Sequence, residues 1–198
     1  MRMQCFYALR RFSACALRAN LRLASGRARL QKQRLQESLK DCARDISQLL
    51  VDGKELQSRI RAEQYLRDEA LEAALDILET LLFFLASRTR FLEDSSEVPR
   101  ELEEVIVSIA WCRKRSGVPE LDTICRQLRR KFGWRFVRDA QFNHFGKVHF
   151  RLVWLLSYDK PVESEIENLL TAIARSQSLT WRARPASHYV PGPAEDRA

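Results

Sequence analysis

The feature that most constrains this chain is the scarcity of helix-breaking signals in its first half. Between Leu17 and Phe91 the one strong signal is Asp52-Gly53. Glycine takes the left-handed backbone conformation that ends a helix without the steric cost of a Cβ atom. The pattern predicts two very long helices joined by a tight reversal, each roughly 50 Å long at about 1.5 Å per residue. Such a hairpin is more typical of a strut or an assembling arm than of a catalytic scaffold.

One apolar stripe runs along the first predicted helix with the spacing of a coiled coil. Its members are Leu17, Leu21, Ala24, Ala28, Gln31 and Leu35, followed after one extra four-residue step by Leu39, Cys42, Ile46 and Leu49. An extra four-residue step is a stutter in such a repeat. The stripe predicts that one face of this helix packs against a partner helix.

The second predicted helix changes character along its length. Its first part is mostly polar, with Leu56 and Ile60 among its few apolar anchors. From Leu71 onward apolar residues cover nearly the whole circumference, including Phe83 and Phe84. A helix that is apolar on several sides is normally buried by several neighbours. We therefore expect later helices to pack on this part of the hairpin.

Proline and glycine divide the rest of the chain into shorter helices. The predicted spans are 99–113, 119–132, 134–142, 147–157 and a last helix that opens at Pro161 with Asp159 as its cap. Within 147–157 the alternation of Val148, Phe150, Leu152 and Trp154 also fits a strand. A helix is the preferred interpretation, because an isolated strand would leave its backbone groups without partners.

Size and composition predict one folded domain. The chain has 198 residues, 45% of them hydrophobic, and its apolar runs are far shorter than the roughly 18 residues that span a bilayer. Five cysteines form no CxxC pair, which favours reduced thiols in a cytosolic protein over a disulfide or metal framework. We divide the chain into a basic N-terminal extension (1–16), a helical domain (17–183) and a proline-containing flexible tail (184–198).

Charge is distributed unevenly along the chain, whose net charge is +8. Every charged residue before Glu37 is basic, whereas the second long helix is mainly acidic. Opposite charges on antiparallel helices can attract within one molecule or between copies. The candidate membrane or filament contacts are Arg18, Arg22, Arg27, Arg29 and Lys32. Four interpretations stay open for this basic helix: a solvated face, a surface for anionic lipid, a nucleic-acid surface, or part of a targeting segment.

Catalytic and metal-binding patterns are not found in the sequence. His144 and His149 are five residues apart and His188 lies in the tail, so no zinc-type spacing arises. The carboxylates of the second long helix fall at spacings that suit surface ion pairs instead of a general acid and base in a cleft. We expect no catalytic residue, no metal site and no cofactor.

Several ordered segments resemble a known family. They are Asn20-Leu21-Arg22-Leu23, Leu49-Leu50 with Gly53-Lys54, Arg59-Ile60-Arg61-Ala62-Glu63, Arg67-Asp68-Glu69, Glu72-Ala73-Ala74-Leu75-Asp76-Ile77-Leu78-Glu79, Ile109-Ala110-Trp111, Pro119-Glu120-Leu121, Lys131-Phe132-Gly133, Asn143, Gly146, Val148, Arg151, Leu152, Pro161 and Trp181. Over about residues 14–183 the chain is similar to the increased-sodium-tolerance family, the ESCRT-III-like regulators of the vacuolar-protein-sorting AAA ATPase.

The resemblance implies an all-α fold with an ESCRT-III-like core, in which a long antiparallel helical hairpin carries four to five shorter helices packed on its open end. It also implies a non-enzymatic protein in the cytoplasm, peripheral to the endosomal membrane. The implied partners are charged multivesicular body proteins, the ATPase, an anionic membrane surface and a homo- or hetero-polymer. The implied processes are multivesicular-body sorting, membrane remodelling and abscission. Nucleic acid is the alternative partner.

Two further expectations concern the end of the chain. The apolar residues of the late helices exceed what a two-helix hairpin covers, which suggests a groove for a partner helix near Glu167 and Asn168; the alternative is that they complete the core. Many family members carry a C-terminal helix that binds the ATPase, but no amphipathic helix follows Trp181. An aromatic cluster departs from the family pattern, and we expect it to reshape the partner groove: Phe142, His144, Phe145, His149, Phe150 and Trp154.

Overall fold

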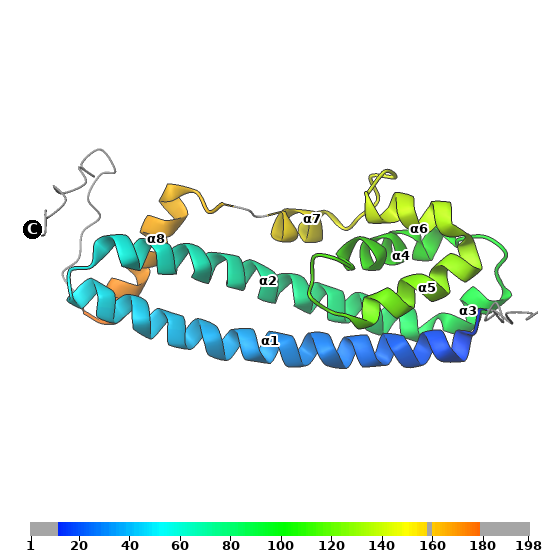
Figure 1. Cartoon of the computed structure of the whole chain (residues 1–198), viewed down its shortest axis with the longest axis horizontal. Coiled ribbons are helices and arrows are strands. Elements are labelled where there is room, and N and C mark those ends of the chain that lie inside the picture. The colour runs from blue at the N-terminus through cyan, green and yellow to red at the C-terminus, as the bar shows by residue number, and fades with distance from the viewer. Residues whose placement is uncertain (1–11, 158–159, 179–198) are drawn as a thin grey trace, which may run out of the picture. The chain divides into compact units, whose positions relative to one another are not determined.

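The computed structural model describes residues 12–157 and 160–178, and every regular element among them is a helix (Figure 1). The order is α1 (Ala14–Val51), α2 (Glu55–Ser87), α3 (Thr89–Asp94), α4 (Arg100–Cys112), α5 (Glu120–Phe132), α6 (Trp134–Gln141), α7 (Phe150–Leu156) and α8 (Glu163–Ser176). The predicted all-α hairpin with shorter helices is confirmed, and α7 is the helix that the alternation had left in competition with a strand. Residues 1–11 of the N-terminal extension, Asp159, Trp181 and the tail at 184–198 lie outside the described residues.

The helices form two compact units. Among the described residues, the larger unit comprises 12–39 and 67–157, and the smaller comprises 40–66 and 160–178. Helices α1 and α2 contribute to both, while α3 to α7 belong to the larger unit and α8 to the smaller one. The sequence had grouped the last helix with the other short ones, but its apolar face belongs to a different core.

The reversal between α1 and α2 is closed by the expected glycine. Gly53 has φ +71°, in the left-handed region. The N–H of Lys54 donates to the carbonyl of Leu49 (2.9 Å), and the N–H of Gly53 donates to that of Leu50 (3.2 Å). This pair of bonds is the Schellman motif, which satisfies the last carbonyls of a helix.

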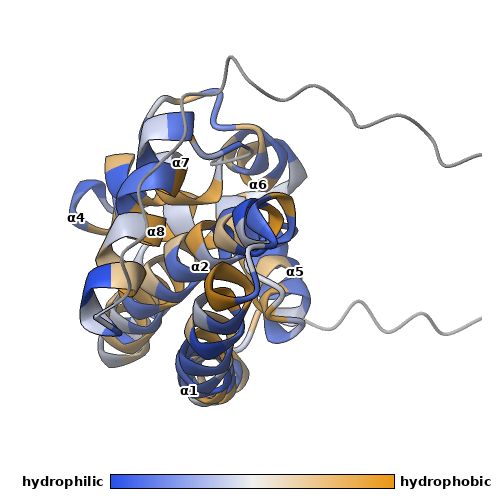
Figure 2. Cartoon of the chain, turned by 90° about the vertical axis from the view of Figure 1, so that its left-hand side faces the viewer, coloured by the Kyte–Doolittle hydropathy of each residue, from blue (hydrophilic) through white to orange (hydrophobic). Residues whose placement is uncertain are grey.

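The larger unit is built around the stripe of α1. Its members Leu17, Leu21, Ala24 and Ala28 are fully buried, and they belong to one core with Leu75, Leu78, Leu82 and Leu85 of α2. In Figure 2 hydrophilic colours predominate along α1, while α2 shows more of the hydrophobic colours. Helix α1 therefore buries a narrow stripe and leaves most of its circumference exposed.

The smaller unit has its own core. Ile46 and Ala62 from the hairpin pack with Ile166 and Leu170 of α8, and all four are buried. The predicted anchors Leu56 and Ile60 are wrong, because both are at least half exposed. Helix α8 covers the face of the hairpin that holds Ile46 and Ala62, and it contributes Ile166 and Leu170 to the core that buries them.

Helix α2 ends earlier than predicted. The sequence predicted one helix to Phe91, but α2 stops at Ser87 and Arg88 takes a non-helical conformation (φ −102°, ψ 10°) before α3. The Ser87 hydroxyl donates to the carbonyl of Phe84 (2.7 Å), and that of Thr89 donates to the carbonyl of Ala86 (3.2 Å). Such side-chain bonds compete with helical hydrogen bonding.

The end of α2 is also less enclosed than its composition predicts. Phe83 is 74% exposed and Phe84 37% exposed, whereas Leu82 and Leu85 are fully buried. The expectation that the whole circumference would be covered is wrong for these two phenylalanines. They form an exposed aromatic edge of the larger unit.

We predict that Leu21→Ala destabilises the protein by about 2 to 5 kcal/mol, because it removes a fully buried side chain and leaves a cavity. Urea unfolding followed by circular dichroism measures the change. Leu23→Ala on the exposed face of the same helix is the matched control, with an expected cost below about 0.5 kcal/mol. Equal costs for the two substitutions would contradict the assignment of the buried stripe.

Candidate partner-binding surfaces

The five basic residues predicted as contacts all lie on α1, in the larger unit. Arg18 is half-buried, and its Nε donates to the Oγ1 of the buried Thr89 (2.7 Å). Arg27 pairs with Glu120 at the start of α5 (Nε to Oε1, 3.0 Å). Arg22 is exposed and has no carboxylate partner among the described residues. These side chains therefore differ in how freely they can meet a partner molecule.

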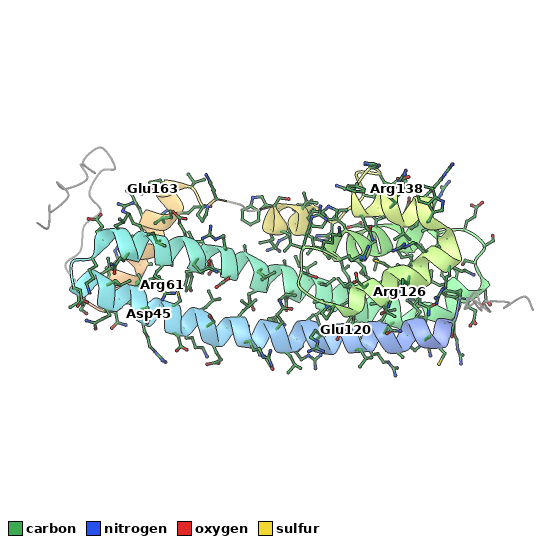
Figure 3. The ribbon with its side chains drawn as sticks, viewed as in Figure 1. Asp45, Arg61, Glu120, Arg126, Arg138 and Glu163 are labelled. Atoms are coloured by element: carbon green, nitrogen blue, oxygen red, sulfur yellow. The ribbon has the colours of Figure 1, made fainter. Side chains whose placement is uncertain are left out.

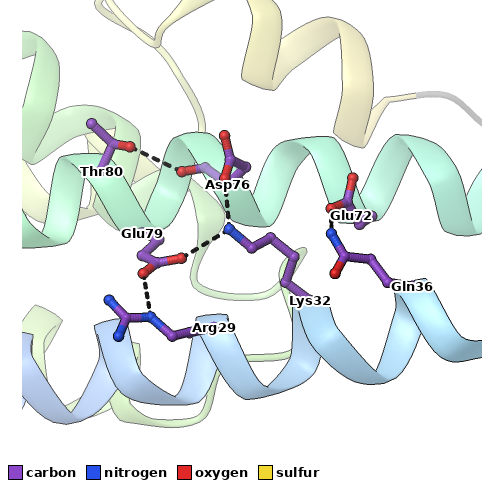
Figure 4. A network of polar contacts seen from close by, with 7 residues as sticks. All are labelled: Arg29, Lys32, Gln36, Glu72, Asp76, Glu79 and Thr80. Carbon is purple, nitrogen blue, oxygen red and sulfur yellow. Dashed lines mark hydrogen bonds and ion pairs between the residues drawn. The ribbon is translucent and has the colours of Figure 1, made fainter.

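Arg29 and Lys32 belong to a polar network between α1 and α2 (Figure 4). The Nε of Arg29 lies 2.7 Å from Glu79 Oε1, and the Nζ of Lys32 lies 2.7 Å from Asp76 Oδ1 and 3.1 Å from Glu79 Oε2. The opposite charges predicted for the two long helices thus meet within the molecule. Because the network lies at the edge of the buried stripe, it fixes the register of the two helices.

The network shifts the protonation of its members. The hydrogen bond to Asp76, aided by Glu79, raises the pKa of Lys32 although burial opposes it. Burial by itself would raise the pKa of Glu79, but the hydrogen bonds and charges of Arg29 and Lys32 outweigh burial and lower that pKa. Since the folded pKa of Glu79 is depressed, its stabilising contribution is present at neutral pH and is lost as the pH falls through that value.

A second charged cluster holds α8 within the smaller unit. The guanidinium of Arg59 pairs with Glu163 and lies 3.2 Å from Glu55 and 3.7 Å from Glu167. Figure 3 shows Glu163 on α8. Of the two predicted groove residues, Glu167 is therefore engaged by Arg59, while Asn168 is exposed. Local sequence patterns could not predict this cluster, because Arg59 and Glu163 are 104 residues apart in the chain.

The apolar face of α8 is largely used inside the smaller unit. Ile166 and Leu170 are buried, with Leu169 and Ile173 packed at the edge of the same core. These side chains complete a core, as the alternative interpretation of the late helices proposed. A partner helix at α8 would meet its outer face, where Asn168 lies.

The predicted aromatic cluster lies on the segment between α6 and α7 and on α7 itself. Phe142 stacks on His144 (ring centroids 5.7 Å apart), and His149 stacks on Phe150 (5.4 Å). Phe145 instead stacks inward on Phe136 (5.5 Å). The cluster is thus a partly exposed aromatic edge rather than the lining of one groove.

Two of the described cysteines, Cys112 and Cys125, are buried in the larger unit. The described residues contain no group of three or more histidine, cysteine or acidic side chains that could hold a metal ion. Burial is the main cause that raises the pKa of Cys112 to about 12 and that of Cys125 to about 11. Thiols with such pKa values are protonated at neutral pH and react slowly.

A family model matches residues 18–180, and its description reads "Regulator of Vps4 activity in the MVB pathway". The chain belongs to the Ist1 family. The match covers all eight described helices except the first turn of α1. It confirms the resemblance read from the sequence and places the chain in a family of regulators of the multivesicular-body pathway.

Two relatives extend this result. An IST1-like protein of Dictyostelium discoideum is 30% identical over 182 residues, which is 92% of this chain and 48% of that protein; the chain thus spans about half the length of this Ist1-family relative. The crystal structure of the S. cerevisiae Ist1 N-terminal domain, in complex with a Did2 MIM motif, matches with a TM-score of 0.80 at 23% identity, over 85% of this chain and 94% of that one. The fold is therefore the ESCRT-III-like helical fold of Ist1.

Within the described residues of this Ist1-family chain, no helix combines the length and the apolar character needed to cross a bilayer.

We predict that Glu79→Gln lowers the free energy of unfolding by about 1 kcal/mol at pH 7, because Arg29 and Lys32 lose their shared carboxylate. Solvent screening limits the effect, since the Arg29 side chain is 64% exposed. Urea unfolding is measured at pH 7 and again at about pH 3, where Glu79 of the unmodified protein is increasingly protonated and the difference shrinks.

Glu104→Gln, which removes an exposed carboxylate of α4 in the same unit, is the control for the loss of one negative charge. A Glu79→Gln protein as stable as the control at pH 7 would show that the network contributes no stability.

Proposed function

We propose that this chain is a non-enzymatic, cofactor-free ESCRT-III-associated protein that binds charged multivesicular body proteins and co-assembles with them. It acts in the cytoplasm, peripheral to the endosomal membrane, and modulates Vps4 in sorting, membrane remodelling and abscission. The observation that carries the proposal is the family match over residues 18–180. The complex of yeast Ist1 with a Did2 MIM motif supports the class of partner.

We place one contact for such a partner on the outer face of α8. Asn168 is exposed there, and Glu167 lies beside it on the same helix. An amphipathic partner helix binds by laying its apolar face along a groove, with polar contacts at the rim. Because Glu167 already lies 3.7 Å from the guanidinium of Arg59, Asn168 is the more available of the two polar groups.

We predict that Asn168→Arg weakens binding of a fluorescent MIM-motif peptide about tenfold, because a long charged side chain blocks the groove. Fluorescence anisotropy with the full chain measures the affinity. Glu167→Gln tests the neighbouring position, and Gln177→Arg, at an exposed position past the end of α8, is the charge-matched control. Peptide affinity that is equal in the Asn168→Arg and Gln177→Arg proteins would remove α8 as the binding site.

We further propose that the arginines of α1 attract an anionic partner surface, either the membrane or a neighbouring subunit of the polymer. Arg22 pairs with no carboxylate of the described residues, and the paired side chains of Arg27 and Arg29 are still 54% and 64% exposed. Arg18 and Lys32 are bonded to other side chains of the larger unit. They therefore contribute positive charge to this surface more than they contribute direct contacts with a partner.

We predict that Arg22→Glu reduces binding to phosphatidylserine vesicles or assembly with a charged multivesicular body protein several-fold at low salt, since each basic side chain near an anionic surface contributes about 1 kcal/mol. Cosedimentation measures both. The control is Lys114→Glu, an exposed charge reversal on the segment after α4. Duplex and single-stranded oligonucleotides are tested in parallel, and a preference for them would favour the nucleic-acid alternative.

A further inference from the structure

Helix α1 carries a second apolar stripe that the hairpin does not use. It consists of Ala19, Leu23, Gly26 and Leu30, with spacings of four, three and four residues. Leu23 is 62% exposed and Leu30 is 55% exposed, although the buried stripe of the same helix is fully covered. At about 100° per residue the four residues share one narrow face, which points away from the buried stripe. Spacing alone does not distinguish this exposed stripe from the buried one, because both stripes have the same spacing.

Gly26 in the middle of this stripe has no structural cause within the described chain. It does not take a positive φ, and a Cβ atom built on it would meet no atom within 4 Å. Glycine in a helix interior is destabilising relative to alanine, so a glycine retained there without a packing reason is unexpected. A close approach of another backbone is the usual use of such a residue.

Arginines border the stripe on both sides. By the same angular count Arg22 and Arg29 follow one edge, while Arg27 and Arg34 follow the other, and all four are exposed. Among the described residues neither Arg22 nor Arg34 has a carboxylate partner. Two copies of this face would repel each other, whereas a helix with acidic flanks would be complementary along its whole length.

A hollow beside Gly26 offers room for a side chain. It has a volume of about 320 Å³, and its lining includes Arg22, Ser25, Gly26, Arg29 and Phe83. The exposed ring of Phe83 stands at this hollow, so an apolar knob from a neighbouring helix would find an apolar wall with arginines beside it.

We infer that the Ala19–Leu23–Gly26–Leu30 face of α1 is a docking seam for an acidic amphipathic helix of a partner protein, with Gly26 at the point of closest approach. The inference rests on the proposed function, because it names the anionic partner of the α1 arginines. Binding of this face to a lipid surface would explain the exposed leucines and arginines, but it would not explain the glycine.

The experiment uses the full chain and a fluorescent synthetic helix of about three heptads, with leucines on one stripe and glutamates on both flanks. Gly26→Leu is expected to weaken binding at least about tenfold, because the added bulk separates the helices. Gly26→Ala is expected to weaken binding several-fold while raising the urea midpoint of the protein. If Gly26 acted only in folding, Gly26→Ala would not raise the stability of the protein and at the same time lower its affinity for the peptide.

Ser38→Leu is the matched control, since it adds the same side chain at another exposed face of α1, and its affinity should equal that of the unmodified protein. The inference is overturned if the unmodified chain does not bind the peptide or if Gly26→Leu binds it equally well. Stronger binding of Gly26→Leu to phosphatidylserine vesicles would assign the stripe to lipid instead. Binding of the MIM-motif peptide at α8 is measured on the same samples, so that failure of the seam is distinguished from failure of the proposed function.

Discussion

The pairing of α1 with α2 is the interaction on which the rest of the structure depends. A helix as polar as α1 is stabilised mainly by the apolar stripe that it buries, because helix propensity alone contributes little per residue. Leucines of α2 meet that stripe, and the Glu79 network holds the edge of the contact. Since the stripe is narrow, the packing that forms the hairpin also leaves a long charged surface in water.

Local signals account for the parts of the fold that the sequence predicts well. Gly53 supplies the left-handed residue that closes α1. Proline or glycine stands before α4, α5 and α6. These effects act within a few residues, so a single sequence reveals them. The break between α2 and α3 is different, because Arg18 binds Thr89 from 71 residues away. The position of α8 also depends on a long-range contact, with Ile46 and Ala62. The hydrophobic periodicity of each helix does not reveal that these segments pack together.

The candidate site follows the same division. The basic character of α1 is plain from the sequence, but its electrostatic meaning depends on which acid each side chain meets. Arg27 and Arg29 reach carboxylates on other helices, while Arg22 does not. The sequence pattern therefore reveals the basic helix. It does not reveal which basic side chains form ion pairs within the molecule and which remain available to a partner. In a family of regulators, that division decides which charged residues are available to a partner protein.

The cluster around Arg59 has a consequence for motion in the smaller unit. The core that holds α8 has only four buried side chains, with six partly buried ones packed against it, and one shared guanidinium adds to it, so local opening of α8 costs far less than global unfolding. Amide hydrogen exchange should accordingly be fast along α8 under native conditions and slower along the buried stripe of α1. High salt should accelerate that exchange selectively, because the guanidinium contacts are partly solvated. Release of this helix would uncover Ile46 and Ala62 as a transient apolar surface, governed by ionic strength.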